Sequence, residues 1–242
     1  ICDKINDEKH RYFSIICLRQ IYLLRGRFHL VDKYVTIEQN FVRKSGSQRR
    51  IAEGLINFGD VYLERGDLAK AERQYTDALE MLLSLQERYK ACVTYCRLSE
   101  VALRKNDFAK AIEYARQGRA LAAPGDILRQ NQTWRVMGMV KAAIGEVVEA
   151  EQCFRKSIEV VGGNPIYDLG CSYLEAGRFY RATGHKQKAV RHLKKAEQIF
   201  TRMGATHFAR KATGELEKVM KKRSKQNGKT SSVSRTKRPI EG

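Results

Sequence analysis

The sequence predicts an all-α fold in which about five helical hairpins stack side by side into a solenoid. Its composition favours helices, because it has only 3 prolines in 242 residues and is rich in Ala, Leu, Glu, Lys and Arg. Its hydrophobic content of 43% is ordinary for a folded soluble protein. A turn residue also recurs along the chain, at Gly26, Gly66, Asn106, Gly145 and Gly184. The steps between these five turn markers are 40, 40, 39 and 39 residues, and a fixed period of this size is the signature of stacked repeats.

Each turn marker is expected to separate the two helices of one hairpin. A helix that ends in a left-handed residue prefers Gly there and Asn next, and the markers are four glycines and one asparagine. The predicted helices span residues 3–24, 28–44, 48–64, 68–87, 89–104, 108–122, 127–143, 147–161, 167–182, 186–203 and 206–223. The last helix has apolar residues on one stripe and basic residues opposite, so we expect it to cap the end of the solenoid.

Two positions in each hairpin are expected to mark the closest approach of the paired helices. Five residues after each marker lie Val31, Ala71, Ala111, Ala150 and Ala189. Seven residues before each marker lie Arg19, Gly59, Ser99, Gly138 and Gly177. A large side chain at either position would hold the helices apart. The first hairpin, which carries Arg19, is degenerate, as expected of a terminal unit.

These residues resemble the tetratricopeptide repeat (TPR) family. The second hairpin matches best, through Gly59, Tyr62, Gly66, Ala71, Tyr75 and Ala78. The resemblance covers roughly residues 12–204, but the period of 39–40 residues exceeds the usual TPR length of about 34. This longer form is similar to the helical arrays of bacterial signalling and transcription regulators, and of some eukaryotic scaffold and motor-adaptor proteins.

The resemblance implies a right-handed α-α superhelix whose first helices line a concave groove. It also implies a noncatalytic protein–protein interaction module, for scaffolding or sensing, within a larger cytoplasmic regulatory protein. The family's groove positions fall on Glu53, Asn57, Asp60, Glu64, Arg97, Glu100, Arg104, Gln132, Arg135, Met139, Leu174, Arg178 and Arg181. This wall would be acidic toward its N-terminal half and basic toward its C-terminal half, which favours a peptide or partner helix of opposite polarity along its length. The alternative is that these side chains are merely solvated.

Catalytic signatures are missing from the sequence. It contains no GxxxxGK[ST] phosphate loop, GxGxxG turn, GxSxG elbow or HExxH helix. The five histidines are scattered over different hairpins and the six cysteines form no CxxC pair, so we expect no metal site and no disulfide framework. Small buried thiols in a reducing cytoplasm explain the cysteines better. We therefore predict that the chain is not an enzyme and binds no cofactor.

The net charge of +19 raises an alternative function, in which a TPR protein associates with nucleic acid through its basic surface and tail. Nine Lys or Arg and one Glu lie within residues 218–242, so much of this charge belongs to the tail. We predict a solenoid with its capping helix over residues 1–222 and a disordered basic tail or linker over 223–242, which is too poor in apolar residues to fold. A two-part nuclear import signal and nonspecific phosphate contacts are the other interpretations of this tail.

Two further expectations concern the start of the chain. No apolar run approaches the roughly 20 residues needed to cross a bilayer, and the first ten residues lack the apolar core of a secretory signal. We therefore expect a cytoplasmic fragment of a longer protein.

A further alternative is self-association through apolar residues of the first hairpin, namely Phe13, Ile16, Ile21 and Leu24.

Overall fold

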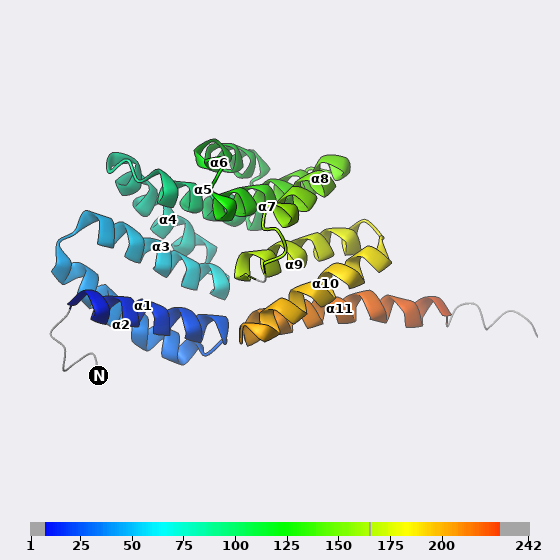
Figure 1. Ribbon diagram of the computed structural model, residues 1–242, viewed down its shortest axis with the longest axis horizontal. Coiled ribbons are helices and arrows are strands. Elements are labelled where there is room, and N and C mark those ends of the chain that lie inside the picture. Colours follow the sequence, from blue (N-terminus) through cyan, green and yellow to red (C-terminus); the bar gives the residue numbers. More distant parts are fainter. Residues whose placement is uncertain (1–7, 165, 228–242) are drawn as a thin grey trace, which may run out of the picture.

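Eleven α-helices make up the part of the chain that the computed structural model describes, residues 8–164 and 166–227, and no strand occurs there. The helices are α1 Glu8–Leu24, α2 Phe28–Ser45, α3 Gln48–Arg65, α4 Leu68–Ser84, α5 Arg88–Arg104, α6 Phe108–Leu121, α7 Ile127–Ala143, α8 Val147–Glu159, α9 Tyr167–Ala182, α10 Lys186–Arg202 and α11 Thr206–Asn227. Successive helices pair into five hairpins that stack side by side, and α11 follows the last of them (Figure 1). The predicted all-α solenoid of five hairpins and a final helix is confirmed. The predicted tail falls mostly outside the described residues, so it stays a prediction, as does the boundary at residue 222.

The turn markers behave as the repeat pattern predicts. All five adopt the left-handed conformation, with φ of 70°, 80°, 60°, 85° and 84° in chain order. After α3, the N–H of Gly66 donates to the Leu63 carbonyl at 3.1 Å and the N–H of Asp67 donates to the Tyr62 carbonyl at 3.0 Å. The Asp67 side chain then accepts from the N–H of Lys70 and begins α4. A hairpin turn therefore needs only Gly66 and Asp67 between its two helices.

The small residues let the paired helices approach closely, as predicted. A Cβ added at Gly59 would lie 2.5 Å from the Tyr75 ring, and one added at Gly177 would lie 2.6 Å from Cγ of Leu193. Real Cβ atoms do not come this close to other atoms, so both positions require glycine unless the helices separate. All five residues that follow the markers by five positions are fully buried.

In the first hairpin, a buried ion pair between α1 and α2 occupies the position where the other hairpins have small residues. Nε of Arg19 lies 2.8 Å from Oε2 of Glu38, and both side chains are within 1% of complete burial. Asn57 of α3 donates to the other oxygen of Glu38 at 2.6 Å. At the equivalent positions the second hairpin has Gly59 and Ala78, which need no polar partner. Burial raises the pKa of Glu38, whereas the charge of Arg19 and the hydrogen bond from Asn57 oppose that rise.

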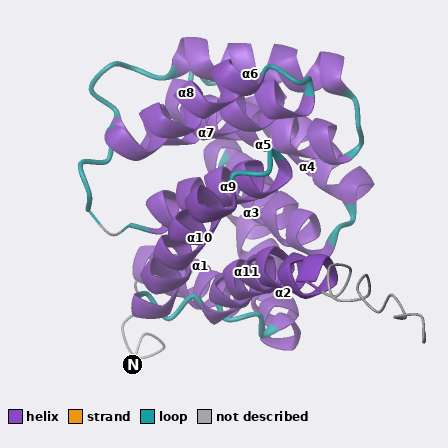
Figure 2. Cartoon of the chain, turned by 90° about the vertical axis from the view of Figure 1, so that its right-hand side faces the viewer, coloured by secondary structure: helices purple, strands orange, loops and turns teal. Residues whose placement is uncertain are grey.

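The two ends of the array meet. His207 of α11 packs edge-on against Phe28 of α2 with ring centroids 5.6 Å apart, and the Thr206 hydroxyl donates to the Arg25 carbonyl at 3.4 Å. Figures 1 and 2 show α1 and α2 beside the C-terminal helices, although most of the chain separates them in sequence. The solenoid is therefore a closed ring, which the repeat pattern does not predict.

The last helix fills two roles at once. Its apolar stripe of Phe208, Ala212, Leu216 and Val219 is buried against the last hairpin, so the predicted cap is confirmed. Leu24 of α1 packs against the same cluster, and ring closure thus covers one of the residues predicted for self-association. Phe13 remains 67% exposed, so self-association through the rest of α1 stays a prediction.

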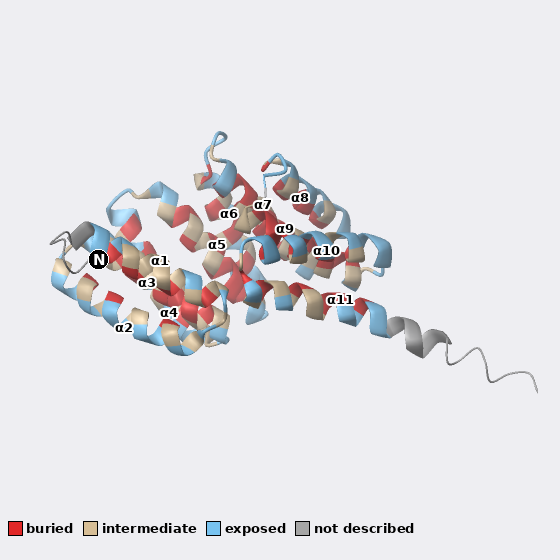
Figure 3. Cartoon of the chain, turned by 60° about the horizontal axis from the view of Figure 1, so that its bottom comes forward, coloured by how far each residue is buried: buried red, intermediate tan, exposed pale blue. Residues whose placement is uncertain are grey.

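Burial follows the contacts between helices. Figure 3 shows buried residues concentrated where helices face one another, while the outer faces of the ring are exposed. Within the described residues, no helix is both long enough and apolar enough to cross a membrane.

Candidate ligand-binding cavity

The inner helices of the ring line a partly open cavity of about 260 Å³. Each of the five inner helices contributes the residue that lies six positions before its turn marker, and these residues are Gln20, Asp60, Glu100, Met139 and Arg178. The constant register follows from the repeat, because equivalent positions of stacked hairpins face the same side. Phe208 and Lys211 of α11 complete the lining, so both ends of the chain contribute to one cavity.

Most of the predicted groove residues line this cavity. They are Asp60, Glu64, Arg97, Glu100, Arg104, Arg135, Met139, Leu174 and Arg178. The other four have different surroundings. Asn57 donates a hydrogen bond to the buried Glu38 at 2.6 Å, and Gln132 donates one to Asp168 at 3.0 Å. Arg181 lies 2.9 Å from Glu215. Glu53 lines a separate surface hollow beside Tyr12 and Phe13.

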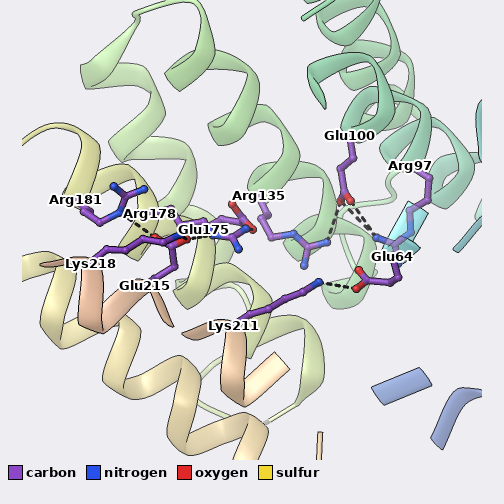
Figure 4. Close-up of polar contacts among 10 residues, drawn as sticks. All are labelled: Glu64, Arg97, Glu100, Arg135, Glu175, Arg178, Arg181, Lys211, Glu215 and Lys218. Atoms are coloured by element: carbon purple, nitrogen blue, oxygen red, sulfur yellow. Dashed lines mark hydrogen bonds and ion pairs between the residues drawn. The ribbon is translucent and has the colours of Figure 1, made fainter. Parts of the chain in front are cut away.

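The predicted separation of acidic and basic halves is wrong. In the N-terminal half, Asp60 lies 2.9 Å from Nε of Arg97, and Arg97 also contacts Glu100 at 3.4 Å. Figure 4 shows that acidic and basic side chains also alternate over the rest of the wall, where Glu64, Glu100 and Glu175 lie among Arg97, Arg135, Arg178 and Lys211. Five basic and four acidic side chains line the cavity, so it has no strong net charge of either sign.

Carboxylates from α9 and α11 neutralise the predicted basic half. Arg178 lies 2.7 Å from Glu175 one turn earlier in α9. Glu215 of α11 lies 2.9 Å from Arg181 and 3.7 Å from Arg178 (Figure 4). The sequence-based assignment missed this because it took only the first helix of each hairpin as the wall, whereas α11 brings its own charges to that wall.

Arg135 of α7 is the most deeply placed cation of the cavity. Its side chain is only 5% exposed, and it reaches toward Glu100 (Figure 4). Its nearest carboxylate oxygens, on Glu100 and Asp168, both lie 3.6 Å away, which is longer than a hydrogen bond. Nη1 of Arg135 has no hydrogen-bond partner among the described residues. Nη1 faces Asp168 and Nη2 faces Glu100, so the buried guanidinium lies between two carboxylates.

A three-residue contact closes the cavity at the junction of the chain ends. Glu64 of α3 lies 2.5 Å from Nζ of Lys211 and 3.2 Å from Nε2 of His207. Burial raises the pKa of Glu64, but the hydrogen bond from His207 and the charge of Lys211 outweigh it and lower that pKa to about 2. The carboxylate is therefore ionised at neutral pH and joins α3 to α11.

The cavity offers little for catalysis. Burial raises the pKa of the Cys171 thiol to about 12, so this side chain is a neutral lining group and not a thiolate nucleophile. Burial likewise raises the pKa of the Tyr167 hydroxyl well above its ordinary value. Within the described part of the chain, no three His, Cys, Asp or Glu side chains gather as a metal site would require.

Several cavity residues were not predicted from the sequence. Tyr167, Cys171 and Glu175 lie on α9, the helix whose groove positions were assigned to Leu174, Arg178 and Arg181. A signal for Glu175 existed, because it lies three residues before Arg178 and pairs with it. No sequence signal places Phe208 and Lys211 there, because they arrive only when the ring closes.

The family comparison agrees with this geometry. A family model described as the MalT-like TPR region matches residues 5–220, which is most of the chain. The chain belongs to the MalT-like TPR family. The predicted resemblance to long-repeat TPR arrays is thereby confirmed. No curated protein is significantly similar to this MalT-like TPR chain in sequence.

Solved structures share its fold. A Rap protein complexed with Competence and Sporulation Factor is similar over 91% of this chain and 72% of its own, with 13% identity and a TM-score of 0.66. BtubC from P. vanneervenii is similar over 90% of this chain and 98% of its own, with 17% identity and a TM-score of 0.52. RapI in its apo form is similar over 91% of this chain and 72% of its own, with 17% identity and a TM-score of 0.53. At these identities the likeness concerns the fold alone.

Proposed function

We propose that this MalT-like TPR chain is a noncatalytic interaction module, for scaffolding or sensing, in a cytoplasmic regulatory protein, and that it binds a short peptide segment in the ring cavity. The observation that carries the proposal is the convergence of one side chain from every inner helix on the same cavity. Polar groups that converge on a partly apolar cavity are the usual form of a ligand site. The Rap structure with Competence and Sporulation Factor supports a ligand role for this fold.

The size of the cavity favours a short segment over a partner helix. The volume lies just below the range of roughly 300–1,000 Å³ that is common for small-ligand sites.

A cavity-filling substitution tests this proposal. The immobilised full chain is offered a random hexapeptide library, and the retained peptides are identified by mass spectrometry. Met139→Trp should abolish retention, because the larger side chain occupies the cavity that Met139 lines. Val148→Trp is the matched control, because Val148 is 65% exposed outside the cavity. Equal retention by both variants, with unchanged circular dichroism, would show that peptides do not bind in the cavity.

The outer face of α10 supports a second candidate function, in nucleic-acid association. Lys188, Arg191, Lys194 and Lys195 are exposed along it. Among the residues that the structure describes, only Lys188 of these four has an acidic partner, Glu151 at 2.8 Å. Such a face suits phosphate contacts with strong salt dependence. Replacing these four residues by Gln should then weaken binding of the full chain to a random duplex DNA. Unchanged DNA affinity would exclude α10 as the contact surface.

A further inference from the structure

A groove of about 540 Å³ lies on the outer face of the ring, between α8 and α10. Both helices pack against α9. They are the second helices of successive hairpins, so they run in the same direction on either side of the groove. One part of the groove is lined by Ile158 of α8, Tyr173 of α9 and Lys195 of α10, and these three residues define the outer groove.

The preceding pair of hairpins shows how this chain can close such a groove. The repeat of 39 residues gives each residue of the outer groove an equivalent, namely Arg119 for Ile158, Trp134 for Tyr173 and Lys156 for Lys195. The guanidinium carbon of Arg119 lies 4.2 Å from the centroid of the Trp134 ring, and Nζ of Lys156 lies 4.4 Å from it. Both distances are within the roughly 6 Å of a cation–π contact. Side chains from both walls therefore cover the indole.

The outer groove has only one of these two covers. Nζ of Lys195 lies 5.1 Å from the centroid of the Tyr173 ring and donates to the Tyr173 hydroxyl at 3.4 Å, so the α10 wall repeats the contact of Lys156. The α8 wall instead presents Ile158, which is only partly buried. Ile158 and Tyr173 pack against the same two apolar clusters. An apolar surface is therefore left where the preceding hairpin has a guanidinium.

The charges that line the groove leave an excess of positive charge on one wall. Its two carboxylates already have basic partners at 2.8 and 3.6 Å, in the pairs Glu151–Lys188 and Glu159–Arg155. Arg191 and Lys195 are exposed on the α10 wall, and neither has an acidic partner within the described part of the chain. One wall is thus apolar and the other basic, which matches a partner with an apolar side and an acidic side.

We propose that the outer groove is a docking site for an acidic amphipathic helix of a partner protein. An apolar side chain of that helix packs on Ile158 and Tyr173, and its carboxylates face Arg191 and Lys195. A helix suits this place because the groove is bordered by two helices that run in the same direction, and helices pack by fitting side chains into the grooves of their neighbours.

Other occupants fit the same surface less well. Residues 223–242 of this chain contain six Lys or Arg and one Glu, so they do not complement a basic wall. Single-stranded nucleic acid stacks its bases on open aromatic faces. The Tyr173 ring already has Lys195 over it and the His192 ring beside it, with centroids 5.7 Å apart. Duplex DNA would use the basic wall but would have no use for the apolar one.

Two libraries of fourteen-residue peptides test the proposal against the immobilised full chain. Both have apolar residues at helical spacing, and the remaining positions are mostly Glu in one library and mostly Lys in the other. The wild-type chain should retain the Glu library in preference to the Lys library. Retained peptides are identified by mass spectrometry, and their affinities are then measured one at a time.

Ile158→Arg reproduces the closure of the preceding groove. It should weaken binding of a retained Glu peptide roughly ten- to a hundred-fold, because one buried apolar contact is removed. The variant also adds a positive charge, so a purely electrostatic contact would be kept or strengthened. The double variant Arg191→Glu and Lys195→Glu should cost about tenfold, and it keeps the test valid if Ile158→Arg does not fold, because both side chains are exposed.

Matched controls change residues outside the groove. Leu83→Arg is the control for Ile158→Arg, because Leu83 is 49% exposed on α4. The double variant Arg73→Glu and Arg116→Glu makes the same change in net charge on the exposed faces of α4 and α6. Both controls should bind Glu peptides as the wild type does.

Several results would overturn the proposal. Retention of neither library, or equal retention of both, would exclude an acidic helix. A Glu peptide bound equally by the wild type and by folded Ile158→Arg would lie elsewhere on the chain. Random duplex DNA that binds Ile158→Arg at least as tightly as the wild type, with no Glu peptide retained, would make nucleic acid the partner. Light scattering that shows a dimer in the wild type but not in Ile158→Arg would assign the groove to a second copy. None of these results decides the peptide site in the ring cavity, which Met139→Trp tests separately.

Discussion

The contact between Glu64 and Lys211 is expected to contribute a measurable part of the stability of the closed ring. The pKa of Glu64 is lowered from 4.5 to about 2 in the folded chain. At about 1.4 kcal/mol per pKa unit, this shift corresponds to roughly 3 kcal/mol of stability at neutral pH. Because glutamine still accepts a hydrogen bond, Glu64→Gln should reduce the free energy of unfolding by about 2–3 kcal/mol.

The dependence on pH follows from the direction of the shift. The pKa is lower in the folded chain, so the unfolded chain takes up the proton first as the pH falls. The stabilisation by Glu64 is therefore complete above about pH 5 and is lost as the pH falls toward about 2. The difference in stability between the wild type and Glu64→Gln should shrink over the same range.

Urea unfolding followed by circular dichroism at pH 7, 5 and 4 measures this difference. Glu80→Gln is the matched control, because Glu80 is exposed on α4, and its stability should stay within about 0.5 kcal/mol of the wild type. A Glu64→Gln variant as stable as this control at pH 7 would refute the reasoning. So would a difference that grows as the pH is lowered.

Two further predictions concern the packing of the hairpins. Gly177→Ala should lower the free energy of unfolding in urea by about 1–3 kcal/mol, because its Cβ would lie 2.6 Å from Leu193. Gly125→Ala is the control and should not lower it, because a Cβ there has no atom within 4 Å. Equal urea midpoints of unfolding for the two variants would contradict the close crossing. Arg19→Met should lower the free energy of unfolding by about 3–5 kcal/mol, because it leaves the buried carboxylate of Glu38 without its cation. Adding Glu38→Ala should restore part of that stability. A double variant no more stable than the single one would exclude an ion-pair role.

The hairpins themselves could be predicted because their determinants are local. A left-handed residue at Gly66 or Asn106 ends a helix through contacts within a few residues, and a small residue at Gly177 fixes the crossing with the next helix. These requirements repeat with every unit, so a single sequence already displays them several times. The register of the cavity wall follows from the same period, which is why nine of the assigned groove residues line one cavity.

The charges on that wall could not be predicted in the same way. Arg178 and Arg181 look basic in the sequence, but Glu215 reaches them from a helix more than thirty residues later. The repeat period does not fix how strongly the superhelix curves, so it cannot tell whether α11 meets α3. The buried pair of Arg19 and Glu38 was likewise hidden, because the repeat places Arg19 at a helix crossing but does not show that Glu38 of α2 neutralises it there.

A disulfide between the two ends of the chain tests ring closure most directly. A Cβ built at Gly26 lies 3.3 Å from Cβ of His207, close to the roughly 3.5–4.5 Å that a disulfide requires, although the two residues are 181 positions apart. A cysteine with φ of 70° at position 26 costs roughly 1–2 kcal/mol of backbone strain, so the double variant is first checked for folding by circular dichroism. The double variant Gly26→Cys and His207→Cys should cross-link under mild oxidation and yield the linked peptides in an unreduced tryptic digest. Only unlinked peptides from a folded double variant would mean that the array is open and that α11 does not complete the cavity lining.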